Sequence, residues 1–291
     1  NNYIPGGNSH LITVSSRTPD SLEHLYYKTL SSTQPQLFFT PEEEDIGKDG
    51  LAGLGIDEES RFVCFVARDQ AYLDATFPNE NWQHHDYRNS SINNYLPAVD
   101  ELTNRGYVAV RMGSIVKENL CTSNPMIIDY ACDGRTDFLD IYLSSKCRFF
   151  LGTDSGMLIF PAMFKRPVVS VNLLRLPLIS TWTHTILVIP KKVYSKKEGR
   201  LLKFSELLEF LNISCNPLIF KQLEFIENTS EEITAVALEM DDRLNGIWET
   251  NEEDEELQRR FWALFGPDKL KSPSLRMGAE FLRQNRDLLE S

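Results

Sequence analysis

Short apolar runs alternate with amphipathic segments through the middle of the chain. The runs are rich in β-branched and aromatic residues, as buried strands are, and they lie at 62–66, 108–112, 148–151, 168–171 and 186–189. Between the first two runs, apolar residues recur at helical spacing, at Ile92, Tyr95, Leu96, Val99 and Leu102. Strands separated by helices predict an α/β fold with a parallel sheet and helices on both faces.

Further helical segments follow the same logic. Phe138, Ile141 and Tyr142 mark one face of a second helix, and a short helix is expected after Gly156. From Ser230 onward the pattern is helical and charged. Its apolar positions include Leu257, Phe261, Leu264 and Phe265. The chain therefore ends in a predicted helical segment.

The pattern divides the chain into three parts. Residues 1–39 hold no long periodic segment, and Thr40-Pro41-Glu42-Glu43 forms a capping box that opens a helix ending near Gly53 and Gly55. We therefore assign residues 1–55 to a linker or remnant with this helix, residues 56–225 to the parallel α/β domain, and residues 226–291 to the C-terminal helical segment. Residues 1–39 are expected to pack on the domain without a sheet of their own.

Composition and charge narrow the class of protein. The net charge of −12 disfavours nonspecific attraction to nucleic acid or to an anionic membrane. No run approaches the roughly 20 apolar residues that cross a bilayer, and no signal peptide stands at the start, so we expect a cytoplasmic protein. The five cysteines include no close pair, which argues against a disulfide framework and against a zinc site. The first residue is Asn1, which suggests a piece of a longer protein that lacks an N-terminal domain or works with a partner chain.

The most informative stretch is 148–171, which predicts a buried strand, a polar turn, a short helix and a second strand. Its turn, Thr153-Asp154-Ser155-Gly156, has small residues that let a ligand approach the backbone, and free amides at the start of a helix favour phosphate. Pro161 must lie in the first turn of that helix. The alternative is structural, because such residues also cap helices in any α/β protein.

Parallel strands bring their carboxyl ends to one edge of the sheet, where ligands bind. Arg68 and Asp69 follow the strand at 62–66. Arg111 lies at the end of the strand at 108–112, and Gly113 and Ser114 follow it. Thr153 to Gly156 follow the strand at 148–151, and Asn172 follows the strand at 168–171. Arginine presents a planar fork of donors that suits phosphate. We therefore predict a diphosphate site with Arg68, Arg111, Gly113, Ser114, Thr153, Asp154, Ser155 and Gly156. The alternative for either arginine is a salt bridge, for example to Asp69 or Asp137.

The connection from Gln70 to Asn89 is long and rich in aromatic residues, which favours a functional loop over a disordered one. Aromatic faces such as Trp82 suit a sugar or a base, and we expect the loop to close over the donor sugar or the acceptor. A metal site at His84-His85-Asp86 is disfavoured because adjacent histidines point apart and no other histidine is near in sequence. We predict no metal and no cofactor. Asp69, His85 and Asp86 are the candidates for a catalytic base. Asp137 and Asp140 share a helix face, which capping and surface charge explain.

Several segments together resemble a family of bacterial glycosyltransferases associated with surface-polysaccharide synthesis. They are residues 62–73 (FVCFVARDQAYL), 85–92 (HDYRNSSI), 106–113 (GYVAVRMG), 129–131 (DYA), 137–140 (DFLD) and 149–156 (FFLGTDSG). The likeness covers roughly residues 35–175. It implies a GT-B architecture of two Rossmann-like domains, of which this chain holds the donor-binding half.

Within that superfamily, the segment at 149–171 is similar to the donor site of heptosyltransferases, and Arg68-Asp69 is distantly similar to a donor motif of fucosyltransferases. The resemblance implies that Arg68, Arg111 and the residues from Thr153 to Gly156 bind the donor. The histidine that heptosyltransferases have after this glycine is absent, since Met157 follows Gly156. No complete N-terminal Rossmann domain precedes residue 40, so the acceptor site implied by the family would lie elsewhere.

The function expected from these observations is sugar transfer from a nucleotide-sugar donor to a glycan or lipid-linked acceptor, with inversion and without a metal. Arginines and amides would stabilise the leaving diphosphate while a carboxylate or imidazole accepts the proton of the acceptor hydroxyl. Two alternatives stay open. One is a nucleotide-sugar epimerase-like enzyme, and the other is a non-catalytic module that binds sugar nucleotides or glycans.

Overall fold

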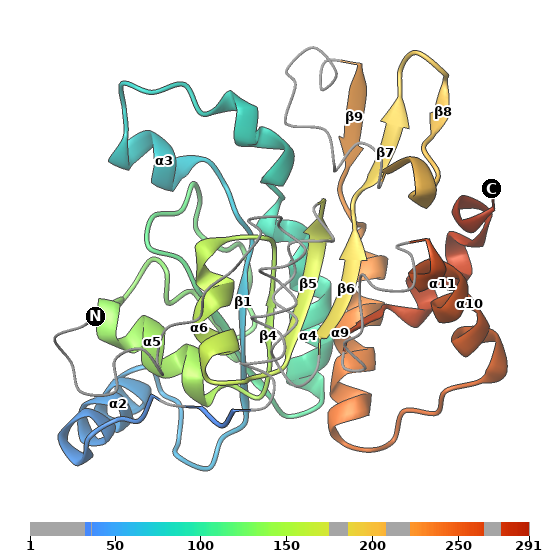
Figure 1. Ribbon diagram of the computed structural model, residues 1–291. Coiled ribbons are helices and arrows are strands. Elements are labelled where there is room, and N and C mark those ends of the chain that lie inside the picture. Colours follow the sequence, from blue (N-terminus) through green and yellow to red (C-terminus); the bar gives the residue numbers. More distant parts are fainter. Residues whose placement is uncertain (1–32, 36, 175–185, 208–221, 265–274, 291) are drawn as a thin grey trace, which may run out of the picture.

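The computed structural model describes residues 33–35, 37–174, 186–207, 222–264 and 275–290, and its centre is a seven-stranded parallel sheet (Figure 1). The strands are β1 (Phe62–Val66), β2 (Val108–Arg111), β3 (Ile127–Ile128), β4 (Phe150–Gly152), β5 (Val168–Leu173), β6 (Ile186–Pro190) and β10 (Leu275–Met277). Their order across the sheet is β3-β2-β1-β4-β5-β6-β10, and every pair is parallel. The chain thus runs outwards from β1 to β3, returns to β4 beside β1, and runs outwards on the other side. This is the strand order of a Rossmann-like fold.

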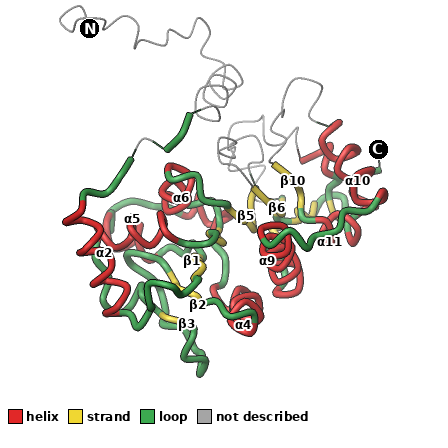
Figure 2. The backbone as a smooth tube through the Cα atoms, turned by 90° about the horizontal axis from the view of Figure 1, so that it is seen from below, coloured by secondary structure: helices red, strands yellow, loops and turns green. Residues whose placement is uncertain are grey.

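Helices cover both faces of the sheet, as the alternation of strands and helices predicts (Figure 2). One face carries α2 (Pro41–Gly53), α5 (Asp137–Lys146) and α6 (Ile159–Met163); the other carries α4 (Leu96–Asn104) and α9 (Ser230–Leu244). Within β1, Val63 and Phe65 join the core on the α4 and α9 side, whereas Phe62, Cys64 and Val66 join the core on the α2 and α5 side. A parallel strand buried on both faces needs this continuous apolar sequence.

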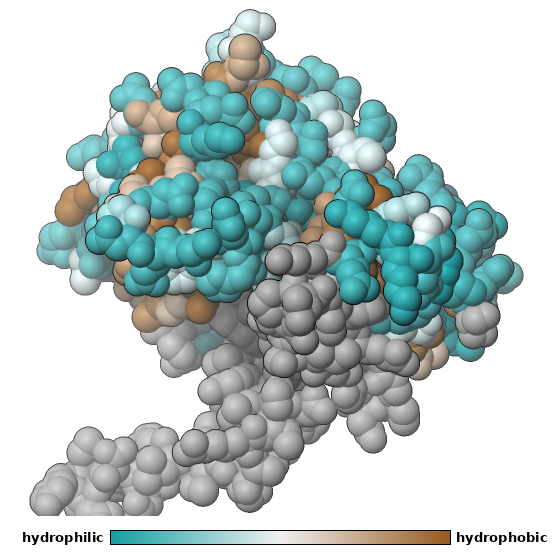
Figure 3. All heavy atoms as spheres, turned by 90° about the horizontal axis from the view of Figure 1, so that it is seen from above, coloured by the Kyte–Doolittle hydropathy of each residue, from teal (hydrophilic) through white to brown (hydrophobic). Residues whose placement is uncertain are grey.

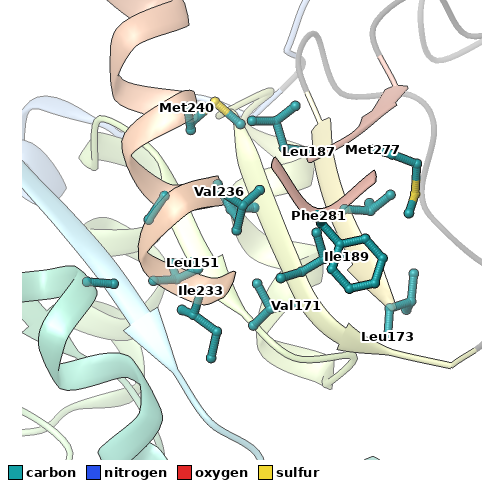
Figure 4. Packing of buried hydrophobic residues seen from close by; sticks show 14 of the residues in the cluster. Leu151, Val171, Leu173, Leu187, Ile189, Ile233, Val236, Met240, Met277 and Phe281 are labelled. Atoms are coloured by element: carbon teal, nitrogen blue, oxygen red, sulfur yellow. The ribbon is translucent and has the colours of Figure 1, made fainter. Parts of the chain in front are cut away.

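The larger core lies between the sheet and α9. Val171 of β5 and Ile189 of β6 lie beside Ile233 and Val236 of α9, and all four side chains are buried (Figure 4). Burying such side chains stabilises the fold by about 1.5–3 kcal/mol each. The C-terminal part of the chain is therefore packed onto the same sheet.

The predicted capping box is confirmed. The Oγ1 of Thr40 accepts a hydrogen bond from the amide of Glu43, and the carboxylate of Glu43 accepts one from the amide of Thr40. The helix α2 ends at Gly53, near the predicted position. It packs on α5 so closely that a Cβ at Gly47 would lie 2.2 Å from the ring of Tyr142. The expectation for residues 1–39 falls almost entirely outside the described residues.

The C-terminal segment also contributes strands. Besides α9 it contains α10 (Glu252–Ala263), α11 (Ala279–Gln284) and η6 (Arg286–Leu289), and it supplies β10 to the edge of the parallel sheet. The helical pattern does not predict β10, which has only three residues. The main chain of Met277 faces away from β6, and the side-chain amide of Gln258 on α10 bonds to it twice: Nε2 donates to the carbonyl (2.7 Å) and Oε1 accepts from the amide (3.1 Å).

A small antiparallel sheet stands beyond the carboxyl end of β6. It consists of β7 (Lys192–Ser195), β8 (Arg200–Leu201) and β9 (Leu223–Ile226), in the order β8-β7-β9. Four short helices lie at the same edge of the main sheet: α3 (Ala71–Thr76), η2 (Gln83–Arg88), η3 (Ile92–Tyr95) and η4 (Gly156–Leu158). In the described part of the chain, no helix has the length and apolar character to cross a membrane.

Candidate functional site

A cavity of about 850 Å³ opens at the carboxyl ends of β1, β2 and β4. Its size falls in the range of small-molecule sites. It lies where β1 and β4 are neighbours, which is the point at which the strand order reverses. Rossmann-like folds bind their ligands at this point. Figure 3 looks onto this edge of the sheet, where the described surface is largely hydrophilic with hydrophobic residues between.

Most of the predicted site residues, from the strand ends and from the connection 70–89, meet at this cavity. Those that line it are Arg68, Asp69, His85, Gly113, Ser114, Ser155 and Gly156. Arg111, Thr153, Asp154 and Asp86 do not line it. The strand ends therefore predict the position of the cavity, but some of the predicted residues lie outside its wall.

Thr153 joins the two strand ends that frame the cavity. The residue is fully buried, and its Oγ1 accepts a hydrogen bond of 2.9 Å from the amide of Arg68. The next residue, Asp154, contacts the connection from Gln70 to Asn89, called the lid segment below, through Arg88. Nη2 of Arg88 donates to the carbonyl of Asp154 at 2.8 Å, and its Nε lies 3.5 Å from the carboxylate. Thr153 and Asp154 thus hold the site together from outside the cavity.

Arg68 lines the cavity and also holds the lid segment. Its Nη1 donates to the carbonyl of His85 (3.3 Å) and to the side-chain oxygen of Asn89. Burial lowers the pKa of the Arg68 guanidinium, and the positive charge of Arg88 lowers it further. Two positive charges beside one cavity favour an anionic ligand, although the carboxylate of Asp154 offsets part of this charge. Arg88 also lines the cavity, although it is not among the predicted site residues.

Arg111 lies in a buried ion pair instead of the cavity. Only 2% of the residue is exposed, and its Nη1 donates to the carboxylate of Asp129 (3.2 Å) and to the carbonyl of Glu118 (2.7 Å). The salt-bridge alternative for this arginine therefore holds, with Asp129 as the partner in place of Asp69 or Asp137. Asp129 follows β3, a two-residue strand that the apolar pattern does not reveal.

Asp69 connects two loops beside the cavity. Its Oδ1 accepts from the amide of Ala71 and its Oδ2 from the amide of Lys117, both at 2.9 Å. The loop it reaches begins at Gly113, which has a φ of 152° and no room for a side chain, since a Cβ would lie 2.7 Å from Val116. Both residues thus shape the wall of the cavity.

The connection from Gln70 to Asn89 is more regular than expected, because it contains α3 and η2. The expectation that His84 and His85 point apart is wrong. Their ring centroids lie 4.1 Å apart, and each ring stacks at 5.7 Å on Trp82. Stacking on one large ring outweighs the divergence of neighbouring side chains. In the described ranges no group of three or more His, Cys, Asp or Glu side chains is placed to hold a metal ion.

A charged pair at the start of α5 is the main feature that the sequence analysis missed. Arg135 and Asp140 both line the cavity, and the guanidinium binds Oδ2 of Asp140 through Nε (3.1 Å) and Nη2 (2.7 Å). Asp140 is 4% exposed. Burial raises the pKa of its carboxyl, and the hydrogen bonds and charge of Arg135 offset only part of that rise. The actual N-cap is Thr136, so Asp140 does not serve as a cap.

Comparison with models of protein families, with curated proteins and with solved structures finds no match to this chain. Functional inference therefore rests on the cavity and on the residues around it.

Proposed function

We propose that the chain binds a nucleotide sugar in the cavity between β1 and β4 and transfers its sugar to a glycan or lipid-linked acceptor. The observation that carries the proposal is the position of this cavity at the reversal of strand order, with Arg68, Arg88, Ser155 and Gly156 in its wall. The sugar-transfer activity follows the resemblance to glycosyltransferases, and the proposed location is the cytoplasm, as the sequence suggests.

Arginines are the main support for a diphosphate. Arg68 and Arg88 line the same cavity and lie close enough for Arg88 to lower the pKa of Arg68. Guanidinium groups bind phosphate through pairs of charge-assisted hydrogen bonds. The helices after the turn, η4 and α6, are too short to add much field of their own. The positive charge at this site thus comes from side chains.

The turn after β4 offers open backbone for the same diphosphate. Gly156 is exposed, and a Cβ built on it meets nothing within 4 Å. The fold therefore does not need a glycine at this position, whereas close approach of a phosphate to the backbone does. We assign the diphosphate to this turn.

The lid segment supplies aromatic surface for the sugar or base. Tyr72 and Trp82 line the cavity, and Trp82 is held by the stacked rings of His84 and His85. Flat aromatic rings pack on the apolar faces of bases and sugars. A lid at this position would also keep water from a reactive glycosyl donor.

The proposed reaction breaks the bond between the anomeric carbon and the diphosphate oxygen and forms a bond from the acceptor oxygen to that carbon. The acceptor proton passes to a base, and the arginines stabilise the charge of the leaving diphosphate. Of the three candidate bases, His85 and Asp69 line the cavity and Asp86 does not. His85 is our choice, since both oxygens of Asp69 accept backbone amides.

A non-catalytic sugar-nucleotide-binding module is the second candidate. The observation that favours it is the loss of two of the three predicted bases. Asp69 has a structural role, and Asp86 lies outside the cavity wall, so His85 is the one that is left. In that case the cavity would bind a donor without turning it over.

Thermal unfolding in the presence of UDP-, GDP-, CMP- and ADP-sugars tests the proposal. A ligand at 100 times its dissociation constant adds about 2.7 kcal/mol to stability. One donor class should raise the melting temperature of the wild type by at least about twice as much as that of Arg68→Gln. No shift with any donor would overturn the proposal.

Incubation of that donor with acceptors then separates the candidates. Nucleotide release that depends on an acceptor supports transfer. Release without acceptor supports the epimerase-like alternative, and binding without release supports the binding module.

A further inference from the structure

A charged pair forms the part of the cavity wall contributed by α5. Arg135 and Asp140 line the cavity together with Asp137 and Ile141. Arg135, just before α5, binds both carboxylates of this wall: Asp137 at 2.7 Å and Asp140 at 2.7 Å. One arginine against two carboxylates disfavours a phosphate here and favours a group that donates hydrogen bonds.

One oxygen of Asp140 is available to such a donor. Both hydrogen bonds from Arg135 go to Oδ2. The other oxygen, Oδ1, is buried and accepts no hydrogen bond in the described part of the chain. The hydroxyl of Tyr130 lies near this carboxyl and lowers its pKa, but it donates its proton to the carbonyl of Thr136. A buried acceptor without a partner is destabilising, and folded proteins hold few of them. Because Asp140 lines the cavity, a ligand that enters the cavity comes next to this side chain.

The pair is rigidly held. Thr136 caps α5 with a 3.1 Å hydrogen bond from the amide of Leu139, and the hydroxyl of Tyr130 donates to the carbonyl of Thr136 (2.9 Å) while it accepts from the amide (3.0 Å). Ser144 donates to the main-chain carbonyl of Asp140 at 2.7 Å. Fixed geometry at a binding group lowers the entropic cost of binding.

We propose that Asp140, oriented by Arg135, accepts a hydrogen bond from a hydroxyl of the sugar and so selects for the sugar part of the ligand. The inference rests on the proposed function. In this arrangement the diphosphate of the ligand lies by Arg68 and the turn after β4, and its sugar lies towards the start of α5.

Calorimetry on two variants tests this subsite. Asp140→Asn keeps the size of the side chain and removes the charge of the acceptor. Asp137→Asn is the matched control, because Asp137 binds the same arginine from the same helix but its side chain is 93% exposed. For the donor that stabilises the wild type, Asp140→Asn should lower the affinity for the sugar nucleotide about 10-fold or more, since hydrogen bonds to charged groups contribute about 1.5–3 kcal/mol. It should leave the affinity for the nucleoside diphosphate within about 2-fold of wild type. Asp137→Asn removes an exposed carboxylate and should weaken sugar-nucleotide binding clearly less than Asp140→Asn does.

The outcomes separate this inference from the proposed function. If the wild type binds no nucleotide sugar, the proposed function fails and the subsite fails with it. If the wild type binds and Asp140→Asn binds both ligands equally well, or loses both equally, only the subsite is overturned.

If Asp140→Asn does not fold, hydrogen exchange on the wild type decides. Amides 137–141 should then slow with the sugar nucleotide and not with the nucleoside diphosphate. Equal slowing by both ligands, or no slowing, would overturn the subsite.

Discussion

The hydroxyl of Thr153 accepts a hydrogen bond from the amide of Arg68, a residue 85 positions earlier in the chain, at 2.9 Å. The contact fastens the end of β1 to the turn after β4, the two segments between which a diphosphate is proposed to bind. Thr153 therefore acts on the site through the position of its neighbours.

This contact predicts a difference between two substitutions of Thr153. Thr153→Val keeps the shape but leaves the amide of Arg68 without its acceptor, which should cost about 1–3 kcal/mol of unfolding free energy. Thr153→Ser keeps the hydroxyl and should recover most of that loss. Urea unfolding measures both. Equal stability of the valine and serine variants would show that the hydrogen bond contributes nothing.

Arg68 and Arg111 should respond differently to replacement by alanine. Arg111→Ala breaks a buried ion pair, so it should lower the unfolding free energy by about 3 kcal/mol, the low end for such pairs because Asp129 is partly exposed. Arg68→Ala should lose less stability and weaken nucleoside diphosphate binding about 10- to 150-fold. Urea unfolding and calorimetry on each variant test this contrast. It is refuted if Arg111→Ala weakens binding at unchanged stability.

Two glycines of the cavity wall provide a further contrast. Gly113→Ala should lower the unfolding free energy by about 1–3 kcal/mol, because its Cβ would collide with Val116 at a φ of 152°. Gly156→Ala should fold with wild-type stability, since its Cβ meets no atom within 4 Å, and should still weaken the binding of the diphosphate. The measurements are thermal unfolding and calorimetry. Wild-type affinity in the folded Gly156→Ala variant would show that the diphosphate does not bind at this turn.

Arg88 should control the opening of the lid segment. Arg88→Gln loses its contacts with both the carbonyl and the carboxylate of Asp154, whereas Asp154→Asn loses only the charge of the carboxylate. Amides of η2 should therefore exchange faster in Arg88→Gln than in Asp154→Asn, and faster in both than in wild type. Hydrogen exchange by mass spectrometry measures the three rates. Unchanged exchange in Arg88→Gln would mean that other contacts hold the segment.

Asp140 gives the stability a predictable dependence on pH. Its pKa in the folded state is raised by burial, so the folded protein keeps this proton to higher pH than the unfolded chain does. The resulting stabilisation is complete below the unfolded pKa of about 3.9 and is lost as pH rises through the folded pKa. The unfolding free energy of wild type minus that of Asp140→Asn should therefore fall as the pH rises from about 4 through the folded pKa. Urea unfolding at several pH values measures the difference, and a rise with pH would contradict the prediction.

The parallel sheet was predictable because each strand is apolar on both faces. The runs at 62–66 and 168–171 correspond to β1 and β5 within two residues, and the alternation with helices indicates the parallel arrangement. In contrast, β3 and β10 have two and three residues and carry no recognisable period. Their places depend on neighbours that are distant in sequence.

The site was predictable to the level of a sheet edge but not of single contacts. Strand ends meet at one edge whatever their side chains do, which is why Arg68 and Gly156 line one cavity. Whether an arginine faces that cavity depends on tertiary partners, and Arg111 finds Asp129. Asp140 was missed because its spacing from Asp137 predicts a shared face, whereas one side chain is buried and the other exposed.

The amide of Gln258 occupies the main-chain groups of Met277 that a neighbouring strand would otherwise use. An edge strand with free groups is a template on which strands of other molecules add. By pairing with β10 as a short strand would, this one side chain leaves the main chain of Met277 without free groups for a strand of another molecule.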